Sequence, residues 1–363
     1  MSQAPLFQPL KVGRMDLTHR VVMAPMTRFR ADDAHVHTDL GVEYYRQRAS
    51  TPGTLLITEG TLITEKAGLY PNVPGIWTQD HIAAWKKITD AVHEEGSYIY
   101  LQLWSHGRAG SADLLKKQGF DLVSSGDIPM EDGAPKPRPL TKDEIDQYVE
   151  DYAQATKNAL EAGFDGVELH NANGYLPDQF LQDTANNRTD EYGGSIENRA
   201  RFSLRIIDAI TSVAGQDRVG IRLSPFSSFQ GMRMADPVPQ FTYLAEQLAG
   251  RYPNLAYLHA VESRVSGITD IEAFAAINFI HEAWGKDRVF LRAGGYKRES
   301  SLATAHDEPN TGIVVGRLFI SNPDLPRRWK NGVPEEPYDR NLFYNAKEAH
   351  GYKDYKAATE PKL

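Results

Sequence analysis

The chain has 363 residues, of which 41% are hydrophobic and 24% are charged, and its formal net charge is -8. This composition is typical of a soluble globular protein, and the negative charge disfavours nucleic acid or an anionic membrane surface as a partner. The absence of cysteine excludes disulfides, thiolate nucleophiles and cysteine-ligated metal sites. The first residues lack the basic start and apolar core of a secretory signal, so we expect a cytoplasmic protein with small-molecule partners.

Eight short apolar runs, each ending in turn or polar residues, predict β-strands. In chain order they cover residues 21–25, 54–60, 98–104, 166–170, 219–225, 256–261, 289–295 and 313–317. Helical patterns alternate with them over residues 39–48, 80–95, 142–162, 196–213, 239–249, 271–284 and, more weakly, 300–306. Apolar strands alternating with helices indicate a parallel sheet covered by helices, and closure at eight strands gives a TIM (β/α)8 barrel. We therefore expect an α/β protein with one TIM-barrel domain over residues 1–363.

Three segments fall outside this repeat. Residues 7–19, ahead of the first strand, are expected to form a hairpin that closes the bottom of the barrel. Residues 105–140 are too long for a simple strand-to-helix loop, and their Gly and Pro content favours an excursion over the active-site mouth. The polar C-terminal tail, residues 338–363, is expected to fold back over the barrel.

Polar or turn residues follow several predicted strands at their carboxyl ends, which carry the active site in TIM barrels. These residues are Thr27, Gly60, Gln102, His170, Arg222 and Arg317. We therefore expect them to meet around one opening.

The densest group of functional side chains is His170-Asn171-Ala172-Asn173-Gly174-Tyr175, directly after the fourth predicted strand. The imidazole and the amide are neutral donors that can both bind one oxygen atom, and a phenol is protonated at neutral pH. Such a set suits polarisation of a carbonyl and delivery of a proton beside it. The alternative is structural, because a histidine after a strand is often satisfied locally and Asn-Gly is a common turn pair.

Further along the chain, residues 187–199 read NRTDEYGGSIENR. Together with the hexapeptide, this segment resembles the old yellow enzyme family of flavin-dependent ene-reductases. Similar segments span nearly the whole chain: Ala24–Arg28, Ile57–Gly60, Gln102–Trp104, Arg222–Pro225, Gly316–Leu325 and Asp339–Tyr344. The resemblance is to the branch of the family with Thr, and not Cys, at position 27. It implies a non-covalent FMN that lies across the top of the barrel.

The resemblance also implies which residues contact the flavin ring. Thr27 would hydrogen-bond flavin O4, with Pro25 and Met26 behind the ring near N5. Gly60 would let the backbone approach the flavin closely, and Gln102 would offer a donor and an acceptor to the pyrimidine edge. A plain strand-end threonine is the alternative for Thr27.

Positive charge is expected at two further places on the flavin. Arg222 would lie against N1 and O2, where negative charge accumulates on reduction, with a structural ion pair as the competing interpretation. The phosphate cradle would combine backbone amides with one guanidinium, as is usual after the last two strands of a barrel. The residues at that position are Gly294, Gly295, Gly316 and Arg317, with Gly295 in place of an Asn found in some relatives.

By the same resemblance, NADPH reduces FMN and leaves, and an activated alkene then binds over the same ring face. Flavin N5 delivers hydride to the β-carbon while His170 and Asn173 bind the carbonyl or nitro oxygen, and Tyr175 protonates the α-carbon. Trp104 and Tyr344 would shape the substrate site, with ordinary barrel packing as the alternative for Trp104. Retention of Tyr175 favours net reduction over the isomerisation performed by biosynthetic family members that lack this tyrosine.

Other readings of a TIM barrel remain open at this point. A Schiff-base aldolase needs a lysine at a strand end, and none is found there. A metal-dependent hydrolase needs clustered ligands, whereas His106, His170 and His259 do not form a clear ligand set, so we expect no metal. A non-catalytic flavin carrier would have no use for His170, Asn173 and Tyr175 together.

Overall fold

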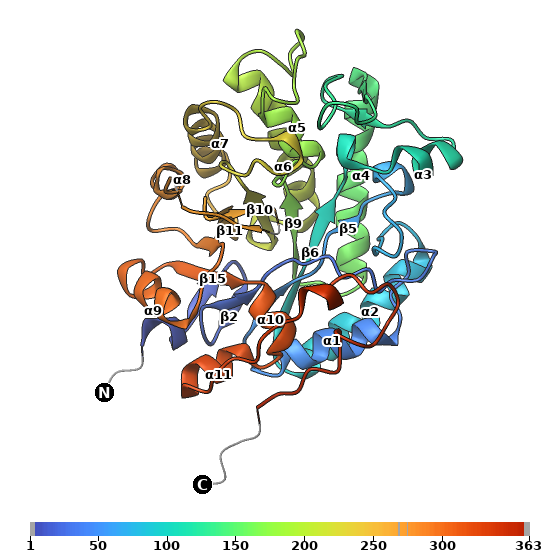
Figure 1. Ribbon diagram of the computed structural model, residues 1–363. Coiled ribbons are helices and arrows are strands. Elements are labelled where there is room, and N and C mark those ends of the chain that lie inside the picture. Colours follow the sequence, from blue (N-terminus) through green and yellow to red (C-terminus); the bar gives the residue numbers. More distant parts are fainter. Residues whose placement is uncertain (1–3, 268, 274, 359–363) are drawn as a thin grey trace.

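The computed structural model describes residues 4–267, 269–273 and 275–358. Eight parallel strands form the main sheet: β3 (Val21–Met23), β4 (Leu55–Ile57), β6 (Tyr98–Trp104), β9 (Gly166–His170), β10 (Val219–Leu223), β11 (Tyr257–Val261), β14 (Phe290–Ala293) and β15 (Thr311–Val315). Strand β15 pairs with β3, and β4 pairs with β6, so the sheet closes on itself. The short strand β5 (Thr61–Leu62) pairs with the end of β6. The predicted TIM barrel is confirmed (Figure 1).

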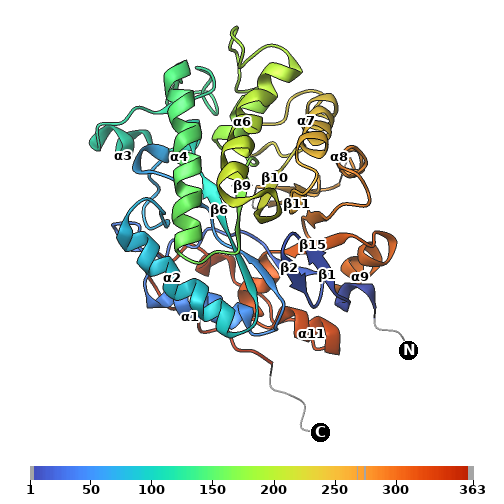
Figure 2. The same ribbon diagram turned by 180° about the vertical axis from the view of Figure 1, so that it is seen from behind.

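Helices cover the outer side of the strands, as Figure 2 shows for α2, α4, α6 and α7. The helices are α1 (Asp39–Ala49), α2 (Gln79–Glu94), α3 (Ala112–Lys117), α4 (Lys142–Glu161), α5 (Leu176–Leu181), α6 (Ile196–Ala214), α7 (Val238–Arg251), α8 (Asn278–Trp284), α9 (Arg298–Asp307), α10 (Arg317–Ser321) and α11 (Leu325–Asn331). Capping boxes at Thr78 and Thr141 satisfy free amides at the starts of α2 and α4. No helix in the described part of the chain combines the length and apolar character needed to cross a membrane.

The predicted helix over residues 271–284 is wrong in its first half, because α8 begins only at Asn278. The chain before it forms a small antiparallel hairpin of β12 (Val265–Ser266) and β13 (Thr269–Asp270). The Ser263 hydroxyl then bonds both the backbone N–H and the carbonyl of Ala275. These bonds to the Ser263 side chain take the place of the backbone hydrogen bonds that Ala275 would form in the predicted helix.

The barrel interior is filled from below by the N-terminal hairpin, β1 (Leu10–Val12) and β2 (Met15–Leu17). Its buried side chains pack in one cluster with inward-facing residues of the strands, among them Val22, Leu55, Tyr100, Tyr257 and Leu291. The tip of the hairpin lies against the start of β10, since a Cβ at Gly13 would meet the Asp217 carbonyl. The hairpin therefore closes the end of the barrel opposite the carboxyl ends of the strands, as predicted.

The excursion after the third barrel strand is also present. Residues 105–140 contain α3 and a parallel pair of two-residue strands, β7 (Val123–Ser124) and β8 (Arg138–Pro139). Met130 and Glu131 from this segment line the cavity at the top of the barrel. The excursion thus forms part of the cavity mouth.

Three buried arginines bind the main chain of the C-terminal segment. Arg28 Nε donates to the Phe343 carbonyl at 3.1 Å, Arg30 Nε to the Glu348 carbonyl at 3.1 Å, and Arg48 Nη2 to the Tyr352 carbonyl at 3.3 Å. The Tyr352 ring stacks on Tyr44 of α1 with a centroid distance of 4.0 Å. Because these guanidinium groups are buried and each donates several hydrogen bonds, they fix residues 343–352 against the barrel. Phe343 and Tyr344 of this segment line the cavity at the top of the barrel.

Glycine is required inside the barrel where a tyrosine fills the space of a second side chain. A Cβ at Gly220 would lie 2.3 Å from the Tyr257 ring. We expect Gly220→Ala to lower the free energy of unfolding by about 1–3 kcal/mol, because this ring cannot move away within a packed core. Urea unfolding measures the change. Gly250→Ala, in α7 with no heavy atom within 4 Å of the new Cβ, is the matched control and should be neutral or slightly stabilising.

Candidate functional site

A cavity of about 1290 Å³ opens at the carboxyl ends of the barrel strands. All of the residues that the sequence suggested for flavin or substrate line it: Pro25, Met26, Thr27, Gly60, Gln102, Trp104, His170, Asn173, Tyr175, Arg222, Gly294, Gly295, Gly316, Arg317 and Tyr344. They come from strands and loops far apart in the sequence. Parallel closure of the sheet is what brings them together.

The turn after β9 presents two of the functional side chains. Asn173 has φ +57° and Gly174 has φ +78°, a conformation that Asn and Gly adopt more readily than other residues. The turn is fixed from two sides: Asn173 N donates to Ser224 Oγ at 2.7 Å, and Gly174 N donates to Asp178 Oδ2 at 2.9 Å. Asp178, which the sequence analysis missed, therefore holds the backbone between the amide and the phenol.

His170 and Tyr175 lie together, with a ring-centroid distance of 4.8 Å. Burial, followed by the positive charge of Arg222, lowers the pKa of His170 well below its usual value. Burial raises the pKa of Tyr175 well above its usual value. The site therefore contains a neutral imidazole and a protonated phenol at neutral pH. His170 Nδ1 is buried without a hydrogen-bond partner among the described residues, so a donor or acceptor position is left for a bound group.

Trp104 packs against both His170 and Tyr175. It also gives Gly60 a different role from the close approach to a flavin that the sequence suggested. Its indole lies 5.0 Å from the Tyr175 ring, edge to face, and is 2% exposed. A Cβ at Gly60 would lie 2.6 Å from the indole, so glycine is needed there for Trp104 to pack. Trp104 Nε1 is buried and has no partner within the described residues.

A polar network lies directly below the cavity, inside the barrel. Gln102 Nε2 donates to Glu168 Oε1 at 2.8 Å, and His259 Nδ1 lies 2.9 Å from Glu168 Oε2. Arg222 forms no salt bridge with a described residue, and its buried Nε has no hydrogen-bond partner there. The competing interpretation of Arg222 as a structural ion pair therefore finds no direct contact to support it. The sequence analysis missed Glu168 and its pairing with His259, although a glutamate inside an apolar strand was a usable signal.

Positive charge gathers across the barrel from His170, at the ends of β14 and β15, beside Gly294, Gly295 and Gly316. Gly294 has φ +124° and Gly295 has φ +64°, which only glycine adopts without strain. Arg317 pairs with both carboxylate oxygens of Asp270. The other cationic side chains that line this end are Arg264, Lys297 and Arg340. Cations in excess of carboxylates and unhindered backbone amides suit a dianion such as a phosphate monoester.

The cavity residues therefore fit FMN in three respects. His170, Trp104 and Arg222 have unpartnered buried polar atoms, and the cationic cluster lies at the ends of β14 and β15. Apolar side chains also line the cavity, among them Ala24, Met26, Val314 and Val315. A planar ring with polar edges and a phosphate-bearing arm matches this arrangement.

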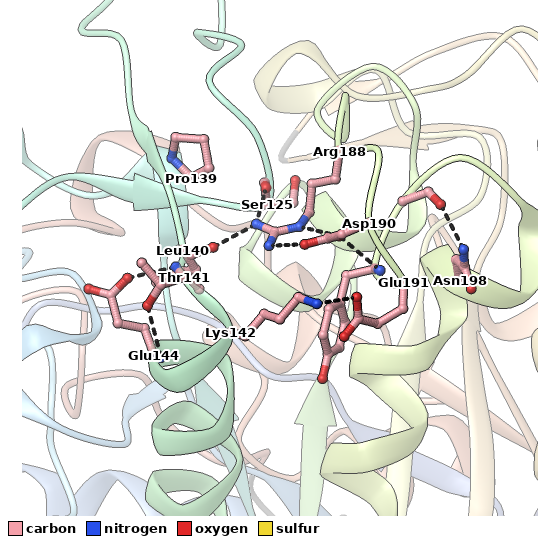
Figure 3. A network of polar contacts seen from close by, with 12 residues as sticks. Ser125, Pro139, Leu140, Thr141, Lys142, Glu144, Arg188, Asp190, Glu191 and Asn198 are labelled. Atoms are coloured by element: carbon pink, nitrogen blue, oxygen red, sulfur yellow. Dashed lines mark hydrogen bonds and ion pairs between the residues drawn. The ribbon is translucent and has the colours of Figure 1, made fainter.

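The second motif of the sequence analysis has a structural role at the mouth (Figure 3). Arg188 Nη1 donates to the Ser125 carbonyl at 3.0 Å and to the Leu140 carbonyl at 2.7 Å. The same guanidinium pairs with Asp190, with Nη2 to Oδ2 at 2.7 Å. Arg188 therefore fixes both ends of the segment that carries Met130 and Glu131 to the cavity.

Metal chemistry finds no support in the described residues, which contain no group of three or more His, Asp or Glu side chains arranged to hold a metal ion. Instead, His106 is fully buried, with Nδ1 2.9 Å from the Gly68 carbonyl. His259 Nδ1 is hydrogen-bonded to the Glu168 carboxylate. These two imidazoles form hydrogen bonds within the protein, His106 to the main chain and His259 to the polar network below the cavity.

Comparison with known proteins places the chain among flavin enzymes. The sequence profile of the NADH:flavin oxidoreductase / NADH oxidase family matches residues 5–336. A chanoclavine-I aldehyde reductase from Penicillium roqueforti (strain FM164) is 53% identical over 359 residues, or 98% of this chain and 97% of the relative. An NADP-dependent oxidoreductase from Aspergillus flavus is 51% identical, over 96% of this chain and 95% of the relative.

The relatives include proteins described as inactive, and the solved structures agree with the fold. A probable inactive reductase from Epichloe festucae var. lolii is 50% identical over 99% of this chain and 97% of the relative. The crystal structure of Old Yellow Enzyme from Pichia sp. AKU4542 has a TM-score of 0.91 and 40% identity, covering 99% of this chain and 95% of that one. Overall similarity thus indicates the fold and the family, but not by itself the activity.

Burial of His106 beside Trp104 predicts a pH dependence of stability. Burial lowers the pKa of His106 to about 3, so the folded chain keeps this imidazole neutral while the unfolded chain protonates it below about pH 6.5. The stabilising contribution is present above pH 6.5 and is lost as the pH falls towards 3. We expect His106→Asn, which keeps an N–H donor for Gly68, to reduce the slope of unfolding free energy by about 1.4 kcal/mol per pH unit between pH 6 and 4.5.

Urea unfolding at several pH values measures this slope. The matched control is His306→Asn, because the His306 side chain is 77% exposed, and it should leave the slope unchanged. An unchanged slope in His106→Asn would contradict the prediction.

Proposed function

Because the chain belongs to the NADH:flavin oxidoreductase / NADH oxidase family, we propose that it is an FMN-dependent ene-reductase that uses NADPH. Its substrates are activated alkenes, the α,β-unsaturated carbonyl or nitro compounds. The observation that carries the proposal is the grouping of a neutral imidazole, a turn amide and a protonated phenol around one side of the cavity. The name of the Aspergillus flavus relative supports an NADP cofactor as the reductant.

The chain supplies binding, orientation and a proton to this reaction. His170 and Asn173 donate hydrogen bonds to the carbonyl or nitro oxygen and stabilise the negative charge that develops there. Tyr175 holds its proton for the α-carbon, since its pKa lies above that of a free phenol. FMN, when bound, supplies the hydride that adds to the β-carbon. One hydride and one proton together saturate the double bond.

The cofactor site is proposed on the same grounds. Thr27 and Gln102 bind the polar edge of the flavin, and Pro25 and Met26 lie behind its ring. Arg222 faces the pyrimidine side that gains negative charge on reduction. Gly294, Gly295, Gly316 and Arg317 would hold the phosphate, and Arg317, which pairs with Asp270 in this structure, would then bind the phosphate.

An inactive flavin-binding protein is the second candidate, because a relative of 50% identity is described as a probable inactive reductase. A catalytic protein uses the Tyr175 phenol, whereas a carrier does not. The deciding experiment is anaerobic. The purified protein should bind FMN, be bleached by NADPH, and regain its oxidised spectrum on addition of an α,β-unsaturated aldehyde, with the saturated aldehyde as product. Bleaching without reoxidation by the alkene favours the inactive protein.

Substitution of Tyr175 by Phe tests the proton donor. We expect Tyr175→Phe to retain FMN and its reduction by NADPH, but to slow reoxidation by an enal or enone about 10²–10⁴-fold. Stopped-flow absorbance of the flavin measures the two half-reactions separately. Tyr98→Phe, at the opposite end of β6, removes a phenol outside the cavity and should leave both rates unchanged. An unchanged reoxidation rate in Tyr175→Phe would remove Tyr175 from the mechanism.

A further inference from the structure

Glu168 is a buried carboxylate with no role in the reaction described above. It lies in the middle of β9, between Val167 and Leu169, which face the outer core, so its side chain points into the barrel. Both of its oxygens are occupied, Oε1 by Gln102 and Oε2 by His259. Its exposed fraction is 0%. Burial of an ionised carboxylate destabilises the folded chain unless hydrogen bonds or an opposite charge compensate for the lost hydration.

Glu168 remains charged despite its burial. Burial alone would raise the pKa of Glu168, but the hydrogen bonds from His259 and Gln102 and the nearby positive charge of Arg222 outweigh that effect and lower the pKa below its usual value. Burial in turn lowers the pKa of His259, so this imidazole is neutral at neutral pH. The polar layer below the cavity therefore holds one negative charge, on Glu168, and one positive charge, on Arg222.

Glu168 determines the orientation of the Gln102 side-chain amide. A carboxylate accepts hydrogen bonds and cannot donate them, so the amide nitrogen of Gln102 must be the atom that faces Glu168. The amide oxygen and the second N–H of Gln102 are then free for a group in the cavity that Gln102 lines. Glu168 thereby sets which atoms Gln102 presents to the pyrimidine edge of a flavin.

The negative charge of Glu168 also acts on Arg222. Arg222 lies on β10 with its Cα in register with His170 of β9 on one side and His259 of β11 on the other. Its guanidinium and the Glu168 carboxylate attract each other across this layer. The carboxylate thus offsets part of the positive field that Arg222 directs into the cavity.

We propose that Glu168 is a positioning residue that orients Gln102 and sets the redox potential of the bound flavin by offsetting Arg222. The inference rests on the proposed FMN site. A flavin held above Glu168 would gain one negative charge on reduction by hydride, which carries two electrons and one proton. A negative charge below the ring disfavours that reduced form, so removal of the charge should favour it.

The test is Glu168→Gln, which keeps the size of the side chain and removes its charge. The amide oxygen can still accept from Gln102, and the amide nitrogen can donate to His259 in its other neutral tautomer. We expect the variant to bind reduced FMN, relative to oxidised FMN, about tenfold more tightly than the unchanged protein, a rise of about 30 mV for a two-electron couple. Anaerobic reduction against a dye of known potential measures the ratio, and quenching of FMN fluorescence measures the affinity for the oxidised form. A role confined to the fold would weaken FMN binding and lower Tm without raising the potential.

His259→Gln is the matched control, because it exchanges one neutral donor to Glu168 for another and should leave the potential unchanged. Glu168→Met, of similar length and also neutral, is the second variant and should raise the potential in the same direction. An unchanged potential in a neutral variant that binds FMN overturns the inference. Failure of both variants to fold also overturns it, since Glu168 would then serve the barrel alone.

FMN binding by the unchanged protein and the redox potential of its variants distinguish failure of the proposed function from failure of the role of Glu168. If the unchanged protein does not bind FMN, the proposed function fails. If it binds FMN and reduces an enal, but neutral variants at position 168 keep its potential, only the role of Glu168 fails.

Discussion

The register of hydrogen bonds between neighbouring parallel strands decides where each functional side chain lies. Gln102 is paired with Glu168, and Arg222 is paired with His170 on one side and with His259 on the other. Because successive side chains of a strand point to opposite faces, a shift of one residue would turn these groups into the helical layer and bring apolar side chains inside. The apolar outward residues of the same strands, packed against the helices, hold the register in place.

Much of the architecture follows from local patterns, and the error has a local cause. The eight strands, the N-terminal hairpin and the excursion after the third strand were predicted from apolar runs and their spacing. Helix α8 was predicted to start seven residues too early, at 271, because apolar residues recur with helical spacing there. Hydrogen bonds between the Ser263 side chain and the Ala275 backbone fix the conformation of that segment. They join residues twelve positions apart, a distance at which hydrophobic periodicity carries no information.

The cavity residues were predicted as a set, but their supports were not. A polar residue at a strand end is visible in a sequence, whereas its partner on another strand depends on closure of the barrel. Glu168 stands inside an apolar run, and its contacts with Gln102 and His259 cross two strand interfaces. The buried guanidinium groups of Arg28 and Arg30 were equally hidden, because arginine is usually exposed and their partners are main-chain carbonyls of the distant tail.

The chain is about equally similar to a reductase and to a probable inactive reductase, with 53% and 50% identity. This is understandable because different residues determine the fold and the chemistry of the cavity. The barrel depends on apolar contacts spread over the whole chain, so it tolerates the loss of any one functional atom. The phenol oxygen of Tyr175 is such an atom, since the packing against Trp104 and His170 involves only the ring. A relative can therefore keep the fold when such an atom is lost. For this chain, the presence of a buried, protonated phenol beside a neutral imidazole is more informative about activity than the overall degree of similarity.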